Sequence, residues 1–153
     1  MEKILNWHDL KEALDSLKAE KKRIVFTNGC FDIIHIGHIR YLNDAKKLGD
    51  ILVVGLNSDS SVRRLKTERP IIPDFQRTEV LASLQMVDYV TLFDEDTPYD
   101  LIKFILPDVL VKGGDWKREE IIGADIVPEV HSLPYIQGVS TTHIVEKIRQ
   151  HDL

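Results

Sequence analysis

The chain has 153 residues, of which 43% are hydrophobic and 29% are charged, and its formal net charge is −5. These values are typical of one globular domain with its own core. The negative charge argues against a nucleic-acid-binding surface, which requires a basic face. No apolar run approaches the roughly 20 residues that cross a bilayer, and no signal-peptide segment follows Lys3. We therefore expect one domain over residues 1–153, with no nucleic-acid or membrane partner.

The single cysteine, Cys30, excludes an internal disulfide and fits a reducing compartment, so we expect a cytoplasmic protein. The domain is expected to divide into an N-terminal helix within residues 1–22 and a core over 23–150. Asn6 is a candidate N-cap for that first helix.

Hydrophobic periodicity predicts helices that alternate with strands. Helical spacing of apolar residues predicts helices over 7–20, 36–48, 59–65, 74–85 and 98–106, a weak helix over 117–126, and a last helix ending at 148. Short apolar runs predict strands over 23–27, 51–56, 87–93, 107–111 and 128–133. The nearly continuous apolar run 51–56 is typical of a parallel strand buried on both faces. We expect an α/β fold built from right-handed βαβ units.

The stretch 27–38 lies between the first strand and the second helix, and it carries two histidines and two glycines. Gly29 lets the backbone turn or approach a ligand closely, and Gly37 does the same between His35 and His38. If the helix begins near residue 36, both imidazoles lie at its N-terminus, where free N–H groups and the helix dipole favour an anion. We interpret the stretch as a phosphate site. Two histidines at this spacing also occur as ordinary surface or core-edge residues, and a metal pair would need a third ligand that the spacing does not supply.

Basic residues between the third and fourth predicted helices are candidates for binding a substrate phosphate. Lys66 and Arg69 lie in a loop with two prolines, and Arg77 lies in the first turn of the following helix. Isolated cations at such edges are also commonly only solvated. Cys30 lies inside the phosphate stretch, but phosphoryl chemistry needs no covalent step, so a nucleophilic role is not favoured.

Two further stretches follow predicted strands and can approach a ligand. Gly113 and Gly114 end the fourth strand, so the backbone there can approach a base or ribose, and Trp116 can stack on a base or simply cover a loop. Three consecutive hydroxyl residues, Ser140–Thr142, precede the last helix. Helix capping explains one of these hydroxyl groups. Three consecutive hydroxyl groups beside open backbone amides are suited to binding a polyphosphate. The acidic run 94–96 is interpreted as a helix start rather than a metal cluster.

Two of these stretches resemble the motifs of one family. Residues 29–38 resemble the Gly-x-Phe-Asp-x-x-His-x-Gly-His motif of the cytidylyltransferase-like nucleotidyltransferases, and residues 138–142 resemble its Gly-x-Ser-Thr-Thr motif. Class I aminoacyl-tRNA synthetases share His-x-Gly-His, but they are much longer. The family joins a nucleoside triphosphate to a phosphorylated small molecule and releases pyrophosphate. The resemblance covers residues 23–149 and implies a Rossmann-like, doubly wound sheet of five parallel strands in the order 3-2-1-4-5. Helices would cover both faces, with the site between strands 1 and 4.

Within the family, the chain is most similar to the D-glycero-β-D-manno-heptose 1-phosphate adenylyltransferases, which occur alone or as the C-terminal half of a bifunctional heptose kinase/adenylyltransferase. The stretches that carry this similarity include 45–50, 57–59, 94–98 and 110–115. Glycerol-3-phosphate cytidylyltransferases often have Met-Gly-Asp-Asp where this chain has Lys112–Asp115, and Arg at the position of Tyr135. Cytidylyl transfer from CTP to glycerol 3-phosphate, or to a related alcohol phosphate, is the alternative reaction. A nucleotide-binding module without turnover is the alternative of another class.

The resemblance implies a role for each motif residue. The catalytic residues are expected to be His35, His38 and Lys66, and the sugar phosphate is expected to contact Lys66 and Arg77. The residues expected to bind the nucleotide follow the two motifs and the fourth strand: Asn28, Gly29, Cys30, Phe31, Gly37, Gly114, Asp115, Gly138, Ser140, Thr141 and Thr142. ATP is the expected substrate, with Mg²⁺ entering on its phosphates and no metal held by the protein alone. A homodimer and a separate heptose kinase are also expected.

Overall fold

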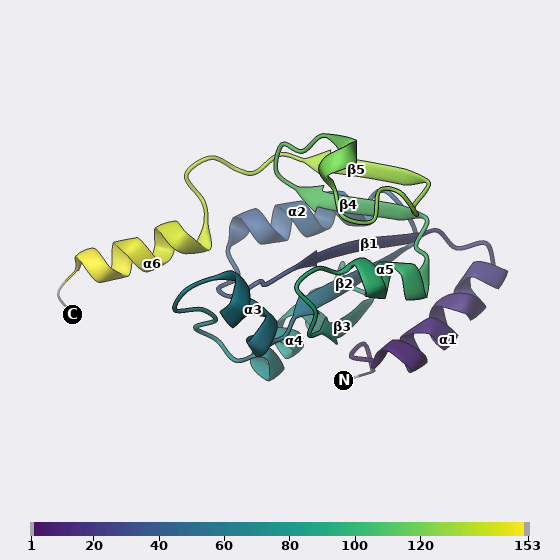
Figure 1. Ribbon diagram of the computed structural model, residues 1–153, viewed down its shortest axis with the longest axis horizontal. Helices are drawn as coiled ribbons and strands as arrows, with labels where there is room; N and C mark the ends of the chain where they lie inside the picture. The colour runs from purple at the N-terminus through teal and green to yellow at the C-terminus, as the bar shows by residue number, and fades with distance from the viewer. Residues whose placement is uncertain (1, 152–153) are drawn as a thin grey trace.

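Five parallel strands form one sheet, in the order β3-β2-β1-β4-β5 (Figure 1). The computed structural model describes residues 2–151; Met1, Asp152 and Leu153, which the expected domain 1–153 includes, lie outside the described residues. The strands are β1 (Ile24–Gly29), β2 (Ile51–Asn57), β3 (Tyr89–Phe93), β4 (Val109–Gly113) and β5 (Glu129–Leu133). The predicted Rossmann-like α/β fold and its strand order are confirmed.

Helices cover both faces of this sheet (Figure 1). They are α1 (Trp7–Ala19), α2 (Ile36–Lys46), α3 (Asp59–Leu65), α4 (Asp74–Ala82), α5 (Tyr99–Ile105) and α6 (Thr141–Gln150), with a short 3-10 helix, η1 (Arg118–Glu120). α2 and α4 contribute to the hydrophobic cluster on one face, and α1 and α5 contribute to the cluster on the other. α6, coloured yellow, extends away from these layers (Figure 1).

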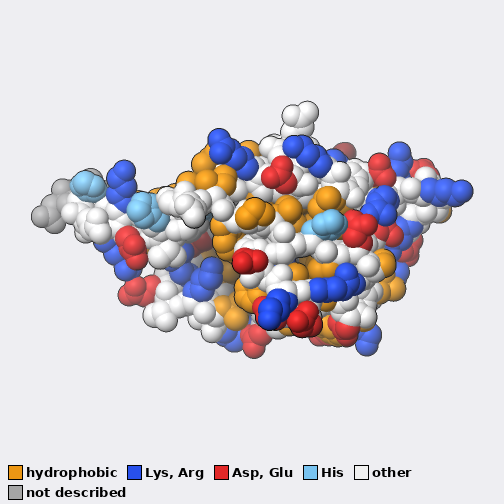
Figure 2. All heavy atoms as spheres, turned by 90° about the horizontal axis from the view of Figure 1, so that it is seen from above, with side chains coloured by type: hydrophobic (Ala, Val, Ile, Leu, Met, Phe, Trp, Pro, Cys, Tyr) orange, Lys and Arg blue, Asp and Glu red, His pale blue; other side chains and the backbone are white. Residues whose placement is uncertain are grey.

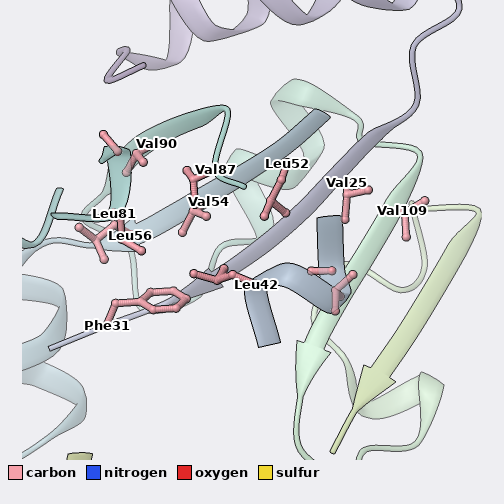
Figure 3. Packing of buried hydrophobic residues seen from close by; sticks show 13 residues of the cluster. Val25, Phe31, Leu42, Leu52, Val54, Leu56, Leu81, Val87, Val90 and Val109 are labelled. Carbon is pink, nitrogen blue, oxygen red and sulfur yellow. The ribbon is translucent and has the colours of Figure 1, made fainter. Parts of the chain in front are cut away.

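Two hydrophobic clusters hold the layers together. Neighbouring strand residues point to opposite faces, so Val25 belongs to the cluster with α2 and α4, whereas Phe26 belongs to the cluster with α1 and α5. On the first face, Leu42 of α2 and Leu81 of α4 are fully buried against strand valines (Figure 3). Burying one such side chain contributes about 1.5–3 kcal/mol, so these contacts fix α2, and with it the His-x-Gly-His stretch, on the sheet.

Several predicted boundaries differ from those observed. β1 and β4 each extend two residues beyond the prediction, to Gly29 and Gly113. α4 ends at Ala82 rather than at 85, because the chain then forms turn-type hydrogen bonds such as Leu84 N to Leu81 O. The predicted helix over 117–126 is wrong apart from η1. Gly123 there has a φ of +94°, and consecutive turns pack Ile121 and Ile126 into the core while Ile122 stays exposed.

Charged side chains on the face seen in Figure 2 are mixed, with Lys and Arg interspersed among Asp and Glu. None of the helices within residues 2–151 combines the length and the apolar character needed to span a membrane.

Candidate active site

The candidate site lies at the carboxyl ends of β1 and β4, the neighbouring strands at which the winding of the sheet reverses. Open α/β sheets bind ligands in the crevice at this point. The chain leaves β1 through Cys30 and Phe31, and Phe31 adopts a positive φ of +46°. Its buried ring lies 5.2 Å from the ring of His38, measured between centroids. The turn therefore folds back beneath the start of α2.

His35 and His38 form a stacked pair at the first turn of α2, with ring centroids 3.9 Å apart. His35 is the N-cap, and its Nδ1 accepts a hydrogen bond from the Gly37 N–H at 3.0 Å. The Nδ1 of His38 accepts one from the backbone N–H of His35 at 3.2 Å. A Cβ at Gly37 would lie 2.8 Å from Cε1 of His35, so glycine is required for this arrangement. Because Nδ1 is the acceptor in both rings, the proton of each neutral imidazole lies on Nε2, which becomes a donor.

The environment keeps both imidazoles neutral near pH 7. Burial lowers the pKa of His38 to about 4, with smaller contributions from the charges of His35 and Lys66. Burial also lowers the pKa of His35. Two neutral Nε2–H donors beside the N-terminus of a helix can bind phosphate oxygens, because the helix dipole there also favours an anion.

Asp32 ties the loop between α3 and α4 to the site. Its carboxylate accepts hydrogen bonds from the N–H groups of Ile71 and Ile72, the shortest at 2.8 Å, and Arg69 lies 3.8 Å away. Arg69 therefore faces this buried carboxylate in the structure, rather than an open phosphate site. Sequence reasoning did not select Asp32, although its place in the Gly-x-Phe-Asp motif was the available signal.

Arg77 was predicted to bind the substrate phosphate, but the structure assigns it a different role. Its side chain has no exposed surface, and its guanidinium donates to the carbonyls of Cys30 (2.6 Å), Asn57 (2.9 Å) and Ile72 (2.8 Å) and to the Asp59 carboxylate (2.8 Å). These bonds leave no guanidinium face open to a ligand. Arg77 instead holds the ends of β1 and β2 and the 66–73 loop in one arrangement, so we correct its assignment to a positioning residue.

Lys66 lies at the C-cap of α3, and its side chain is exposed. No hydrogen bond or ion pair joins its ammonium to another residue of the described chain. Its charge acts on His38, whose pKa it lowers. Lys66 is therefore close enough to the histidine pair for its charge to act on His38.

The end of β4 forms the other side of the crevice. Gly114 has a φ of +110°, a conformation that favours glycine, and its N–H donates to the Leu133 carbonyl at 2.7 Å. Asp115 follows and is exposed. Trp116 donates from Nε1 to the Gly113 carbonyl at 2.9 Å, and the residue as a whole is 43% exposed. The indole therefore covers the strand end and also presents a free surface on which a base can stack.

The second motif reaches the first one at the start of α6. Thr141 donates from Oγ1 to the Ile33 carbonyl at 3.1 Å, and a Cβ at Gly37 would lie 3.5 Å from Val139. The Ser140 hydroxyl caps α6 by accepting from the His143 N–H at 3.0 Å. Gly138 has a φ of +75°, and Thr142 is exposed. The N-termini of α2 and α6 therefore meet, although the two motifs are about a hundred residues apart.

A divalent metal cage is not formed by the side chains around this crevice. The carboxylate of Asp32 is already bonded to two backbone amides. Among the described residues, the group of three potential ligands that lie close together is His8, Asp9 and Glu12, which is exposed on α1. These donors do not fit a Mg²⁺ ion held at the site by protein alone.

The chain is similar in sequence to proteins of a known family. The family model described as cytidylyltransferase-like matches residues 26–147. The bifunctional protein HldE of Nitratiruptor sp. is 55% identical over 147 residues, which is 95% of this chain and 32% of that protein. HldE of Wolinella succinogenes is 52% identical over 149 residues, covering 97% of this chain and 31% of that protein. The chain thus spans about a third of the length of these relatives.

Solved structures show the same architecture. The lipopolysaccharide core biosynthesis protein from Thermoplasma volcanium superposes with a TM-score of 0.66 at 30% identity, covering 76% of this chain and 99% of that chain. Pantoate-beta-alanine ligase from Francisella tularensis superposes with a TM-score of 0.61, covering 97% of this chain and 79% of that one; its 16% identity speaks for the fold alone. With a family model that matches most of its length, the chain belongs to the cytidylyltransferase-like family.

Proposed function

We propose that the chain is a nucleotidyltransferase that transfers AMP from ATP to D-glycero-β-D-manno-heptose 1-phosphate, giving ADP-heptose and pyrophosphate. The observation that carries the proposal is the pair of Nε2–H donors, on His35 and His38, beside the two helix N-termini that meet at this site. Identity of about 55% to HldE proteins over 95% of the chain supports adenylyl transfer to a heptose phosphate. That identity disfavours cytidylyl transfer to glycerol 3-phosphate.

In the proposed reaction, a phosphate oxygen of the sugar attacks the α-phosphorus of ATP. The bond between this phosphorus and the bridging oxygen to the β-phosphate breaks, and pyrophosphate leaves with its electron pair. The attacking and leaving oxygens lie roughly in line, and catalysis consists mainly of positioning and charge stabilisation. His35 and His38 donate from Nε2 to the α-phosphate oxygens and the leaving bridge, where negative charge increases. Lys66 adds a positive charge beside them.

The remaining motif residues are assigned to ATP. Ser140, Thr141 and Thr142, with Gly138 before them, would hold the β- and γ-phosphates at the N-terminus of α6. The backbone around Gly29, Cys30, Phe31 and Gly37 would line the nucleotide, with Asn28 at the end of β1. Gly114 and Asp115 would face the base or ribose beside the exposed ring of Trp116.

Pyrophosphate release, measured with ATP or CTP against heptose 1-phosphate or glycerol 3-phosphate, tests the proposal. We expect release with ATP and the heptose phosphate alone. Release with CTP and glycerol phosphate would replace this substrate assignment. A folded protein that binds ATP but releases no pyrophosphate with any of these acceptors would instead be a nucleotide-binding module.

Four accompanying features belong to the same proposal. Mg²⁺ would enter bound to the triphosphate, which EDTA titration of the activity tests. A separate kinase would supply the sugar phosphate. The free thiol Cys30 supports a cytoplasmic location.

A homodimer is supported by exposed apolar side chains on and beside α4, such as Phe75 at 62% exposure. Sedimentation of wild type and Phe75→Glu tests this last point.

A further inference from the structure

We propose that Lys112 binds the phosphate of the acceptor and so selects a phosphorylated acceptor at this site. This inference rests on the proposed function and adds a residue to it. Lys112 lies in β4, ahead of the glycines that were expected to approach the nucleotide. Its side chain is partly buried.

The register of the sheet places Lys112 on the side of the crevice opposite the histidines. β1 and β4 are paired from Val25 with Val109 to Thr27 with Val111. One residue further along each strand, Asn28 and Lys112 line a common small cavity of about 20 Å³. Val111 belongs to the cluster beneath α2, and Leu110 belongs to the cluster beneath α5. Because strand residues alternate, Lys112 leaves β4 on the same face as Leu110.

The in-line geometry of the reaction makes this face the acceptor's side. The N-terminus of α6, which is proposed to hold the leaving phosphates, touches the chain just before α2, at Ile33. An attacking oxygen must approach the α-phosphorus from the side opposite to the leaving group. It therefore arrives from the face away from α2, which is the side on which Lys112 and Asn28 lie.

The charge of Lys112 has no counterion in the described chain. Within the described residues, its ammonium takes part in none of the ion pairs or side-chain hydrogen bonds, and it lies over the Trp116 ring, 5.3 Å from the ring centroid. Burial lowers the pKa of Lys112, and the charge of Lys66 lowers it further, against an opposing effect of Cys30. A partly buried cation without a partner is unfavourable. An anionic ligand between Lys112 and Lys66 would remove that penalty.

Lys112→Met tests this role, because methionine keeps much of the side-chain volume and removes the charge. We expect the KM for heptose 1-phosphate to rise by about tenfold to a hundredfold, the size of one charge-assisted hydrogen bond. The KM for ATP should stay within about twofold of wild type, because ATP and the acceptor phosphate would bind at separate subsites. Lys112→Arg should recover part of the loss. Lys103→Met, an exposed lysine on α5, is the matched control.

Calorimetric titration of each protein with heptose 1-phosphate gives a readout independent of turnover. Weaker binding to Lys112→Met, with a melting temperature like that of wild type, supports the inference. An unchanged acceptor KM and binding constant, or an equal rise in the KM for ATP, overturns it. If wild type binds the sugar phosphate but releases no pyrophosphate, the proposed reaction fails, and the binding comparison still decides the role of Lys112.

Discussion

Replacing Arg77 by methionine tests how the site is held in place. The side chain is fully buried and joins three backbone carbonyls to the Asp59 carboxylate. Methionine fills most of the space but leaves these acceptors without their donor. Removing one partner of a buried ion pair costs about 3–5 kcal/mol. Asp59 is 25% exposed and can regain water, so we expect the lower end, about 3 kcal/mol.

A loss of this size is large against the total stability of such a domain, about 5–15 kcal/mol. For a chain of this length, 1 kcal/mol corresponds to about 2–4 °C, so the melting temperature should fall by about 6–12 °C. Calorimetry or circular dichroism measures the shift. Arg63→Met, on the exposed surface of α3, is the matched control and should change stability by less than about 0.5 kcal/mol.

A cycle with Asp59→Asn separates the ion pair from the carbonyl contacts. We expect a coupling energy of about 1 kcal/mol or more between the two substitutions, because the atoms are in direct contact at 2.8 Å. A melting temperature for Arg77→Met equal to that of Arg63→Met would refute the structural role. The guanidinium would then be available to a phosphate, as the sequence suggested.

Three further outcomes follow from the site geometry. His38→Ala should reduce the rate of pyrophosphate release by at least about a hundredfold, the loss expected for one preorganised donor, whereas His8→Ala on the exposed surface of α1 should not change it. Nitrogen NMR of His38 should show the Nε2–H tautomer, with protonation near pH 4. The stability that the neutral ring contributes at pH 7 should therefore decline as the pH falls from about 6.5 toward 4. Protonation near pH 6.5 would contradict the buried arrangement. Ser140→Ala should destabilise the fold by about 1 kcal/mol in chemical denaturation through loss of the α6 cap, and it should also raise the KM for ATP.

The fold was predictable because its signals are local. Apolar runs such as 51–56 and the helical pattern of 36–48 each specify an element within about ten residues, and the rule for parallel sheets then places the crevice. The segment 117–126 shows where this reasoning stops. Its apolar residues have helical spacing, but Gly123 at φ +94° and tertiary packing favour turns.

The site was predictable in its two motifs and not in the contacts that support them. Asp32 meets Ile71 and Ile72 across about forty residues of sequence, and Arg77 meets Cys30 across 47. No spacing rule links such positions, so the sequence pattern assigns Arg77 to the ligand. In the fold, Arg77 of α4 instead donates to the carbonyls of Cys30 and Asn57 at the ends of β1 and β2. The protonation state of the histidines was equally inaccessible, because it depends on burial and on which nitrogen meets a backbone amide.

In this site, neutral histidines provide hydrogen-bond donors of fixed direction, and lysines provide the positive charge. His38, which is neutral, donates along a fixed direction set by its Nδ1 bond to the backbone of His35. Lys66 and Lys112 carry positive charge on flexible side chains, which in the proposed reaction would follow the phosphates as they separate. Burial lowers the pKa of His38, and the nearby charges of His35 and Lys66 lower it further, because a protonated His38 would repel them. In the proposed reaction, rigid donors would therefore meet the α-phosphate, where geometry matters most, and mobile cations would meet the groups that arrive and leave.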